Sequence, residues 1–398
     1  MGVFDGSSAS VPATADVVVI GGGIAGASDA FFLGQAGLSV VVVEQGPQLA
    51  GLTTAQSVAC FRAQWDEPDY AALVLPSIEF YGAFAERVGL PDWDIGLRRQ
   101  GWLFLTGEPG GPEAMDRFVA GHRRLGIHDS ESLSGDEARA RFRWLGLDVT
   151  AASYRALDGW VSPYEVTYGF AKASSATFLM STSATGLVVD RGAIAGVATT
   201  RGTIATRKVV LAAGPFSREI AATAGVVLPV EAVRRHRAMV APRPEIPADG
   251  PMTLDLDTHA YWRPEGGGAF LGQGLPEAPS DPALRVPVDW TFPAVVMAAA
   301  GRLVPFWREL ADGLSGSEVS VGAGQYTVTA DGRPIIGALP DLDGLHMHGG
   351  DNGWGVESAP EAGRRLAAAV LAGGNAPDDP FRIDRPSIAA GLDRSITY

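Results

Sequence analysis

The fold is decided by residues 17–44, VVVIGGGIAGASDAFFLGQAGLSVVVVE. This stretch begins and ends with short β-branched runs, Val17–Ile20 and Val40–Val43, which are typical of buried parallel strands. Between them, apolar residues recur at helical spacing from Ile24 to Gly34. Together the three segments predict a strand–helix–strand unit of about 30 residues.

Glycines between the first strand and the helix form a G-x-G-x-x-G pattern. Gly21 permits a tight turn, Gly23 lets the backbone approach a pyrophosphate, and Gly26 allows the helix to pack closely on the strand. The helix N-terminus offers free N–H groups to phosphates. Glu44, at the end of the second strand, can accept hydrogen bonds from ribose hydroxyls. The unit predicts dinucleotide binding, and the alternative is a tight turn without a ligand.

Composition narrows the class of protein. With 398 residues, 46% hydrophobic and 19% charged, the chain is globular and too long for one compact core. Its 31 basic and 45 acidic residues give a net charge of −14, which disfavours nucleic acid and anionic membranes as partners. The single cysteine, Cys60, excludes an internal disulfide and fits a reducing compartment, so we expect a cytoplasmic protein. The first 15 or so residues carry no export signal and are expected to form a flexible arm.

The remainder of the chain adds strands and a second domain. A meander is predicted at 187–189, 194–200 and 202–205, and a strand at 208–211 is expected to join the dinucleotide sheet. Residues 226–324 are rich in proline and aromatic residues and predict an antiparallel sheet with helices. The elements expected there are strands at 259–262 and 268–272 and a helix at 293–310. A strand at 345–348, a glycine loop at 349–355 and a helix at 356–371 complete the pattern.

Four segments, in this order, resemble the D-amino acid oxidase and sarcosine oxidase superfamily of FAD-dependent amine oxidoreductases. They are VVVIGGGIAGASDAFFLGQAGLSVVVVEQ, KVVLAAGPFS, YTVTADGRPIIG and GLHMHGGDNGWGVESAPEAGRRLAAAVL. The resemblance covers residues 15–375 and implies an α/β fold, α+β overall. It implies a Rossmann-like FAD-binding domain of residues 14–92, 151–225 and 325–398. A second, mainly antiparallel-sheet substrate-binding domain would comprise residues 93–150 and 226–324.

The resemblance also implies which residues hold FAD. The ADP half would lie on the glycine pattern and Glu44, with adenine near Ala184 and the isoalloxazine against residues 353–356, where helix N–H groups stabilise negative charge on the ring. The implied set is Gly21, Gly23, Ile24, Ala25, Gly26, Glu44, Gln45, Thr53, Thr54, Ala184, Gly214, Gly353, Trp354, Gly355 and Val356.

Three further residues match substrate positions of the family. Arg62 falls where relatives place an arginine that grips the substrate carboxylate, a task that suits its planar fork. The alternative for Arg62 is an ion pair with Asp66 or Glu67. Tyr261 and Tyr326 match aromatic positions that close the pocket over the flavin, and plain core packing is the alternative for both.

Departures from the family pattern refine these expectations. Gly324 stands where covalent sarcosine oxidases have a cysteine, and no histidine precedes His122, so FAD should be non-covalent. Phe270 replaces a lysine credited with activating oxygen, which leaves oxidase and dehydrogenase open. Glu357 replaces a lysine that helps bind carboxylate, so it would repel a substrate carboxylate and attract a cationic amine. The alternative for Glu357 is a helix cap.

Other polar clusters are weaker candidates. His346 and His348 share one strand face but lack further ligands, so no metal site is expected. Asp255 and Asp257 are expected to lie on a solvated strand face. The run Arg234, Arg235, His236 and Arg237 is likewise expected to be solvated.

The reaction expected from these residues is oxidation of a C–N bond. A hydride would pass from the carbon beside a neutral amine to flavin N5, giving an imine that water hydrolyses. Arg62, Tyr261, Tyr326 and Glu357 would act on an amine or amino acid substrate, with oxygen or another molecule as electron acceptor. The alternatives are a 2-hydroxy acid or glycerol-phosphate dehydrogenase and a flavin-bearing subunit that acts with a partner protein.

Overall fold

The computed structural model describes residues 2–5 and 11–390, and its first sheet has seven strands. Neighbouring strands are parallel except for the last pair, which is antiparallel. In order across the sheet, the strands are β1 (Val3–Asp5), β9 (Thr177–Leu179), β3 (Val40–Val43), β2 (Val17–Ile20), β13 (Val209–Leu211), β20 (Leu345–Gly349) and β19 (Ile335–Ala338). The predicted strand–helix–strand unit is confirmed, and the strand near 208–211 does join this sheet, between β2 and β20.

Strand β2 is apolar at every position because both faces of the sheet are covered. Val17 and Val19 belong to one hydrophobic core, whereas Val18 and Ile20 belong to another. Successive side chains on a strand point to opposite faces, so a strand buried on both sides reads as a continuous apolar run.

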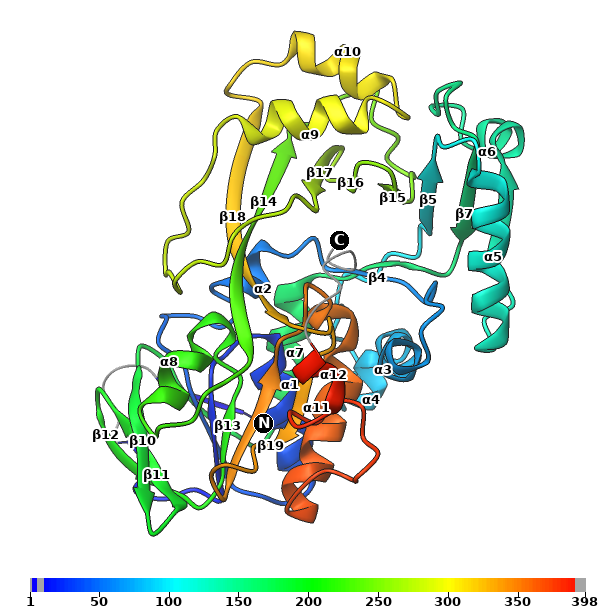
Figure 1. Cartoon of the computed structure of the whole chain (residues 1–398). Helices are drawn as coiled ribbons and strands as arrows, with labels where there is room; N and C mark the ends of the chain where they lie inside the picture. Colours follow the sequence, from blue (N-terminus) through cyan, green and yellow to red (C-terminus); the bar gives the residue numbers. More distant parts are fainter. Residues whose placement is uncertain (1, 6–10, 391–398) are drawn as a thin grey trace.

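Helices cover one face of this sheet, and a small antiparallel meander covers the other (Figure 1). The helices are α1 (Ile24–Gln35), α3 (Pro68–Gly82), α4 (Phe84–Arg87), α7 (Pro163–Ala173) and α11 (Gly355–Ala372). The meander and its helix are β10 (Ala184–Asp190), β11 (Ala193–Thr199), β12 (Gly202–Ala205) and α8 (Ser217–Ala222). Helices α1 and α11 pack together, and Ser28 donates a 2.7 Å hydrogen bond to the Ala359 carbonyl at their crossing.

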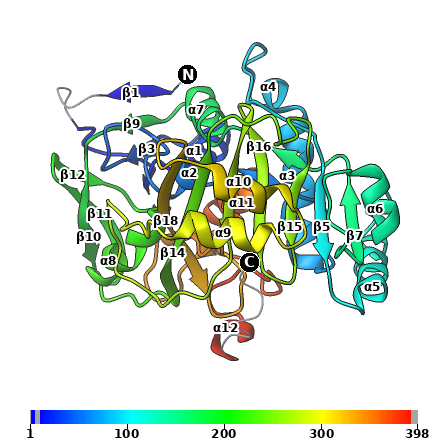
Figure 2. The same cartoon turned by 90° about the horizontal axis from the view of Figure 1, so that it is seen from above.

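The second sheet has eight strands and is antiparallel except between β15 and β5. Its order is β18 (Val319–Thr329), β14 (Val230–Val240), β17 (Gly268–Gln273), β16 (Ala260–Glu265), β15 (Met252–Asp255), β5 (Trp102–Thr106), β7 (Ala151–Arg155) and β6 (Glu131–Ser134). Figures 1 and 2 show α9 (Phe292–Ala300) and α10 (Phe306–Gly313) on the side of it away from the first sheet, and α5 (Gly111–Arg124) and α6 (Gly135–Arg141) beside β7. The expected mainly antiparallel second sheet is therefore present.

The single helix expected at 293–310 is wrong, because the chain forms α9 and α10 with a turn between them. Pro305 has no N–H to donate and restricts the backbone of the residue before it, which ends a continuous helix at this point. The turn still packs inward, since Leu303, Val304 and Trp307 are buried in the core of this layer.

The solvated strand face expected for Asp255 and Asp257 is also wrong. Asp255 is 4% exposed, and Arg302 donates a 2.9 Å hydrogen bond to it and a second ion-paired contact to Asp257. Asp257 also accepts hydrogen bonds from the Thr106 hydroxyl and the Gly107 N–H, both at 2.7 Å. The two carboxylates therefore fasten the end of β5 to the residues that follow α9.

The flexible arm expected at the N-terminus is wrong for Val3–Asp5, which pairs in parallel with β9 at the edge of the first sheet. The Phe4 ring stacks on Phe178 with centroids 5.3 Å apart. Thr14 bridges to Ala205 of the meander. Residues 1 and 6–10 of the expected arm lie outside the described residues.

Short elements complete the description. They are α2 (Thr53–Gln56), β4 (Cys60–Phe61), β8 (Gly159–Trp160), η1 (Gly214–Phe216) and α12 (Pro386–Ala390), and β4 pairs with β8. Among the described residues, no helix combines the length and apolar character needed to cross a bilayer. The division into two domains stays a prediction. Two of its expected boundaries, 150/151 and 324/325, fall beside β7 and within β18, which are both strands of the second sheet.

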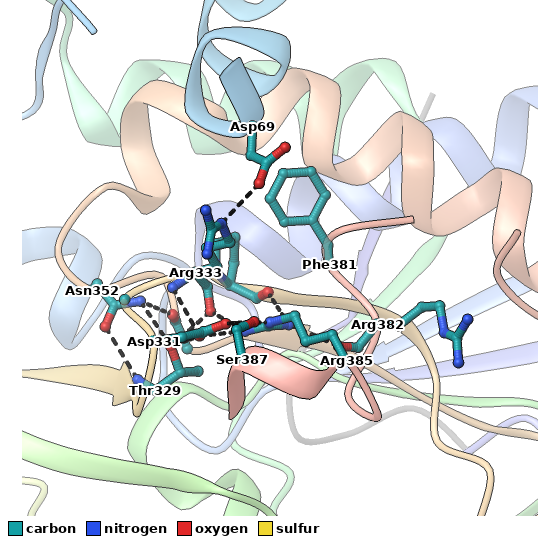
Figure 3. A network of polar contacts seen from close by, with 12 residues as sticks. Asp69, Thr329, Asp331, Arg333, Asn352, Phe381, Arg382, Arg385 and Ser387 are labelled. Carbon is teal, nitrogen blue, oxygen red and sulfur yellow. Dashed lines mark hydrogen bonds and ion pairs between the residues drawn. The ribbon is translucent and has the colours of Figure 1, made fainter. Parts of the chain in front are cut away.

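A buried polar network fastens the C-terminal segment to the turn between β18 and β19 (Figure 3). Arg385 donates to both carboxylate oxygens of Asp331, at 2.6 and 2.8 Å, and its side chain is 5% exposed. Thr329 donates to the same carboxylate at 3.2 Å and also contacts Asn352, which lies in the loop before α11. Asp331 and Thr329 thereby connect the C-terminal segment to that loop.

Candidate functional site

A cavity of about 490 Å³ lies where the carboxyl ends of β2, β3 and β13 meet the loop before α11. It contains most of the residues that the sequence assigned to FAD. The assigned residues that line it are Gly21, Gly23, Ile24, Ala25, Glu44, Gln45, Thr53, Thr54, Ala184, Gly214, Gly353, Gly355 and Val356. Gly26 and Trp354 belong to the same turns but do not line the cavity.

The turn between β2 and α1 is shaped by the absence of side chains. Gly21 has φ +114°, and a Cβ there would lie 2.3 Å from the Ala212 carbonyl oxygen. At Gly26 a Cβ would lie 2.0 Å from the Gly21 carbonyl oxygen, so helix and strand can approach only without it. The Ile24 N–H, in the first turn of α1, donates to the Thr54 hydroxyl at 3.2 Å.

Glu44 holds the turn from the end of β3. Its two oxygens accept hydrogen bonds from the Gly22 N–H at 2.7 Å and the Gly46 N–H at 2.6 Å. Burial raises the pKa of this carboxyl, and the two hydrogen bonds oppose that effect. The two hydrogen bonds therefore fix the position of the Glu44 carboxyl in the cavity wall.

Sequence reasoning missed the wall opposite Glu44. Ser183 and Thr185 beside Ala184, Pro215 and Phe216 after Gly214, and Thr223 of the following turn also line the cavity. Pro215 and Phe216 directly follow β13, so the rule that ligands lie at the carboxyl ends of parallel strands could have found them. No such signal marks Thr223.

At the other end the cavity reaches the second sheet through Tyr326 of β18. The Tyr261 hydroxyl of β16 hydrogen-bonds to the Tyr326 hydroxyl, and burial raises the pKa of both phenols. Arg235 of β14 lies with its guanidinium carbon 5.6 Å from the Tyr326 ring centroid. This end of the cavity therefore combines neutral hydroxyl donors with a nearby cation.

Arg62 and Glu357 lie together but do not line the cavity. The Arg62 guanidinium lies 3.8 Å from the Trp65 ring centroid and 5.1 Å from that of Trp354, and it donates to the Gln64 carbonyl at 3.2 Å. The Arg62 backbone N–H donates to Glu357 at 3.1 Å, so Glu357 connects α11 to β4.

Burial raises the pKa of Glu357 to about 8, and the nearby Arg62 charge partly opposes this. Burial thus favours the neutral carboxyl and weakens the expected repulsion of a substrate carboxylate. The role of Glu357 toward the substrate stays a prediction.

The solvated face expected for the basic run in β14 is wrong. Arg234 pairs with Glu277 at 2.8 Å, and His236 is 6% exposed. Arg237 donates to the carbonyl of Ser57 at 2.9 Å. Because alternate side chains of a strand share a face, Arg235 and Arg237 point toward the first sheet together. Charged residues were mistaken for a surface because sequence alone did not show what faces this strand.

Two positions that depart from the family pattern lie on the face of the second sheet that carries Arg235 and Arg237. Phe270 of β17 lies beneath the guanidinium groups of Arg237 and Arg263, 4.5 and 4.7 Å from its ring centroid. Gly324 of β18 pairs with Arg235, and a Cβ there would lie 2.9 Å from the Gln56 Cβ. Cys60 is a free, half-buried thiol nearby, and burial raises its pKa to about 12.

A buried acid–imidazole pair in the cavity wall was not predicted. Asp29 of α1 is fully buried, and its carboxylate lies 2.8 Å from His348 Nδ1 of β20. His348 and Asp351 both line the cavity. Burial lowers the pKa of His348, but the Asp29 charge and hydrogen bond outweigh it and raise the value to about 9. The available signal was an acid on the apolar face of a helix together with a histidine in a buried strand.

A family model described as FAD dependent oxidoreductase, DAO, matches residues 16–369. The chain belongs to the DAO family. Its expected resemblance to the D-amino acid oxidase and sarcosine oxidase superfamily is confirmed.

Curated relatives of this DAO-family chain differ greatly in length. It is 27% identical to 4-methylaminobutanoate oxidase (formaldehyde-forming) from Paenarthrobacter nicotinovorans, over 91% of the chain, and spans 44% of that enzyme's length. It is 26% identical to sarcosine oxidase subunit beta from an Arthrobacter species, over 93% of the chain and 90% of the relative.

Solved structures share the fold. L-proline dehydrogenase from P. horikoshii superposes with a TM-score of 0.83 at 24% identity, covering 96% of this chain and 100% of that one. Glycine oxidase from Geobacillus kaustophilus gives a TM-score of 0.79 at 25% identity, covering 94% and 99%. The α/β fold with two sheets is thus that of known DAO-family structures.

The cavity residues fit the FAD that the DAO family uses. A backbone turn free of side chains, a helix N-terminus and a fixed carboxyl at Glu44 are the groups that a dinucleotide requires. Elsewhere in the cavity wall, His348 Nε2 is buried without a hydrogen-bond partner among the described residues. The fit therefore extends along the whole cavity.

Proposed function

We propose that this protein oxidises a C–N bond of an amine or amino acid. The substrate carbon loses a hydride, which carries two electrons, and the resulting imine is hydrolysed by water. When bound, FAD supplies the two-electron acceptor at its N5. The observation that supports this proposal most is the end of the cavity at Tyr326. There, tyrosine hydroxyls and the nearby Arg235 of the second sheet meet the predicted isoalloxazine site of residues 353–356.

The chain's own residues would orient the substrate and keep water away from it. Tyr261 and Tyr326 remain neutral because of their raised pKa values, so they donate hydrogen bonds without accepting a proton. Arg62 lies among aromatic rings, where water is scarce and an ionic bond to a carboxylate is stronger than in solvent. Glu357 fixes the backbone of Arg62 and so acts as a positioning residue. Alignment of the reacting C–H is what these groups contribute.

We further propose that FAD is held without a covalent bond. Gly324 offers no side chain for attachment, and Cys60 is a buried thiol whose raised pKa disfavours the reactive thiolate. Acid precipitation of the purified protein tests this directly. Flavin absorbance that moves entirely into the supernatant supports the proposal, and absorbance that stays in the pellet contradicts it.

An anaerobic substrate panel tests the reaction. Amines and amino acids should bleach the flavin absorbance, whereas 2-hydroxy acids and glycerol phosphate should not. The reverse pattern would replace amine oxidation with the hydroxy-acid alternative. Reoxidation of the bleached protein by air, compared with an artificial electron acceptor, then distinguishes oxidase from dehydrogenase.

A second candidate function is a flavin-bearing subunit that works with a partner protein. It is favoured by the match to a beta subunit along 90% of that relative and by the 44% share of a longer oxidase that the chain spans. Bleaching by substrate in the isolated chain, followed by reoxidation only when a second protein is added, would support this candidate.

A further inference from the structure

The Asp29–His348 pair occupies an unusual position in the wall of the cavity. Asp29 reaches across from the second turn of α1, and His348 lies near the carboxyl end of β20. Their side chains are 0% exposed, and 2.8 Å separates the Asp29 oxygen from His348 Nδ1. The pair therefore links the helix that begins at the glycine turn to the strand that leads to the second glycine loop.

One nitrogen of His348 remains available to a ligand. Nε2 is buried and has no hydrogen-bond partner among the described residues, and the nearest carboxylate oxygen, on Asp351, is 3.9 Å away. Because His348 lines the cavity, a group bound there can pair with Nε2, which is a hydrogen-bond donor when the ring is protonated. A buried polar atom without a partner costs free energy, so a ligand that satisfies it is favoured.

The groups that face His348 come from three elements. Asp29 of α1 contacts Nδ1, and Asp351 of the loop before α11 is the second acid. Tyr326 and Thr327 of β18 line the same part of the cavity, and the Thr327 hydroxyl accepts the Gly350 N–H at 3.1 Å. His346, two residues earlier on β20, contacts the Gly344 carbonyl and does not line the cavity. Asp29 therefore makes the only hydrogen bond to the His348 side chain found among the described residues.

We propose that His348, with Asp29 as its positioning residue, donates its Nε2–H to the ring system of bound FAD and makes the flavin easier to reduce. This rests on FAD binding, which the family establishes, and not on the identity of the substrate. A hydride brings two electrons and one proton, so the flavin ring gains one negative charge. A cation fixed in a dry site stabilises that charge without rearranging.

Asp29 gives His348 this role by setting its charge and orientation. A carboxylate hydrogen-bonded to one imidazole nitrogen fixes the ring and directs the other nitrogen outward. With Nδ1–H on Asp29, Nε2 carries a hydrogen to donate only when the ring is protonated. The raised pKa of His348 is consistent with a protonated ring at neutral pH. Without Asp29, burial alone would favour the neutral imidazole.

The test is the midpoint potential of bound FAD, measured anaerobically against reference dyes at pH 7. We compare the wild type with His348→Gln, Asp29→Asn and the matched control His346→Gln, a buried histidine of the same strand outside the cavity. His348→Gln should make reduction at least tenfold less favourable, which is about 30 mV for two electrons. Asp29→Asn should shift the potential in the same direction, and His346→Gln should leave it unchanged.

Three results would overturn the proposal. They are an unchanged potential in His348→Gln, an equal shift in His346→Gln, or a loss of FAD affinity in His348→Gln with no change in potential. The last result would mean that His348 contacts a part of FAD outside the flavin ring, which does not take up electrons. None of them depends on turnover, so failure here is distinguishable from failure of the amine panel.

Wild-type protein alone decides the question if the variants do not fold. Below the pKa of His348, reduction by two electrons should take up one proton, which stays on the flavin. Above that pKa, a second proton should be taken up by His348. The slope of midpoint potential against pH should therefore steepen between pH 7 and 10, and a constant slope would contradict the proposal.

Discussion

Two strand–glycine–helix units of the same sheet direct helix N-termini at the same cavity, yet they are built differently. Between β2 and α1 the turn is short, and its shape depends on positions where a Cβ would collide with backbone. Between β20 and α11, residues 350–354 carry Asp351 and Asn352 and are braced by polar contacts from β18. The shape of the first turn therefore depends on glycines that lack a Cβ. The shape of the second loop depends on hydrogen bonds to residues of β18, which lie elsewhere in the chain.

Removing the ion pair between Arg385 and Asp331, which supports the second loop through Thr329 and Asn352, should have the largest effect on the free energy of unfolding. Arg385→Ala leaves the buried Asp331 carboxylate without its cation, and removal of one member of a buried ion pair costs about 4 kcal/mol. Urea unfolding measures this loss. Arg382→Ala, which removes an exposed pair with Asp384, is the matched control and should cost less than about 1 kcal/mol. Equal losses in the two variants would show that the network in Figure 3 does not brace the fold.

A change in the first turn should come next. Gly26→Ala places a Cβ 2.0 Å from a backbone oxygen, and such overpacking costs about 3 kcal/mol. Because α1 must move away from β2, FAD binding should weaken as well. Thermal unfolding and flavin titration measure the two effects. Gly316→Ala, where no atom lies within 4 Å of the added Cβ, is the control. A Gly26→Ala protein that matches this control would refute the steric argument.

The Asp29–His348 pair, which connects α1 to β20, should make the free energy of unfolding depend on pH. The pKa of His348 is about 9 when folded, above its ordinary value near 6.5. Its contribution is therefore fully present below pH 6.5 and is lost as the pH rises through 9. As the pH rises through these limits, the FAD-free wild type should lose about 3 kcal/mol relative to His348→Gln in urea unfolding. Parallel pH profiles of the two proteins would contradict this expectation.

The hydrogen bond between the two helices should have the smallest effect. Ser28→Ala removes the donor to the Ala359 carbonyl at the crossing of α1 and α11, at a cost of about 1 kcal/mol. Ser28→Gly removes the same donor and additionally the Cβ, which lies near Gly363. If Ser28→Ala is neutral in urea unfolding, close packing alone holds the helices together.

The difference between the two units also explains which parts of the fold and of the site could be predicted from the sequence. The first unit was predictable because its signals are local: two β-branched strands, three glycines and Glu44 lie within one short stretch. The second sheet was predicted in type, since its strands and turns also have local signals. In both cases adjacent residues carry the information.

Features that depend on distant partners were not predictable. Arg385 meets Asp331, Arg302 meets two aspartates, and Asp29 meets His348 only after the chain folds. Their charge alone predicted that Asp255 and the run from Arg234 to Arg237 would be exposed to solvent. The spacing of charged residues does not show which of them form ion pairs with residues far away in the sequence. The helix at 293–310 failed for a different reason: Pro305 was a local signal and was overlooked.

The strand order of the first sheet has a consequence for synthesis of the protein. β2 and β3 leave the ribosome together, but β2 pairs on its other side with β13, and β13 pairs with β20, which is made much later. Until then, β13 is an open edge of valines and leucine, which is a site for aggregation. Nascent chains that stop before α11 should therefore need chaperones and retain no FAD, so the cofactor can be loaded only after α11 has been made.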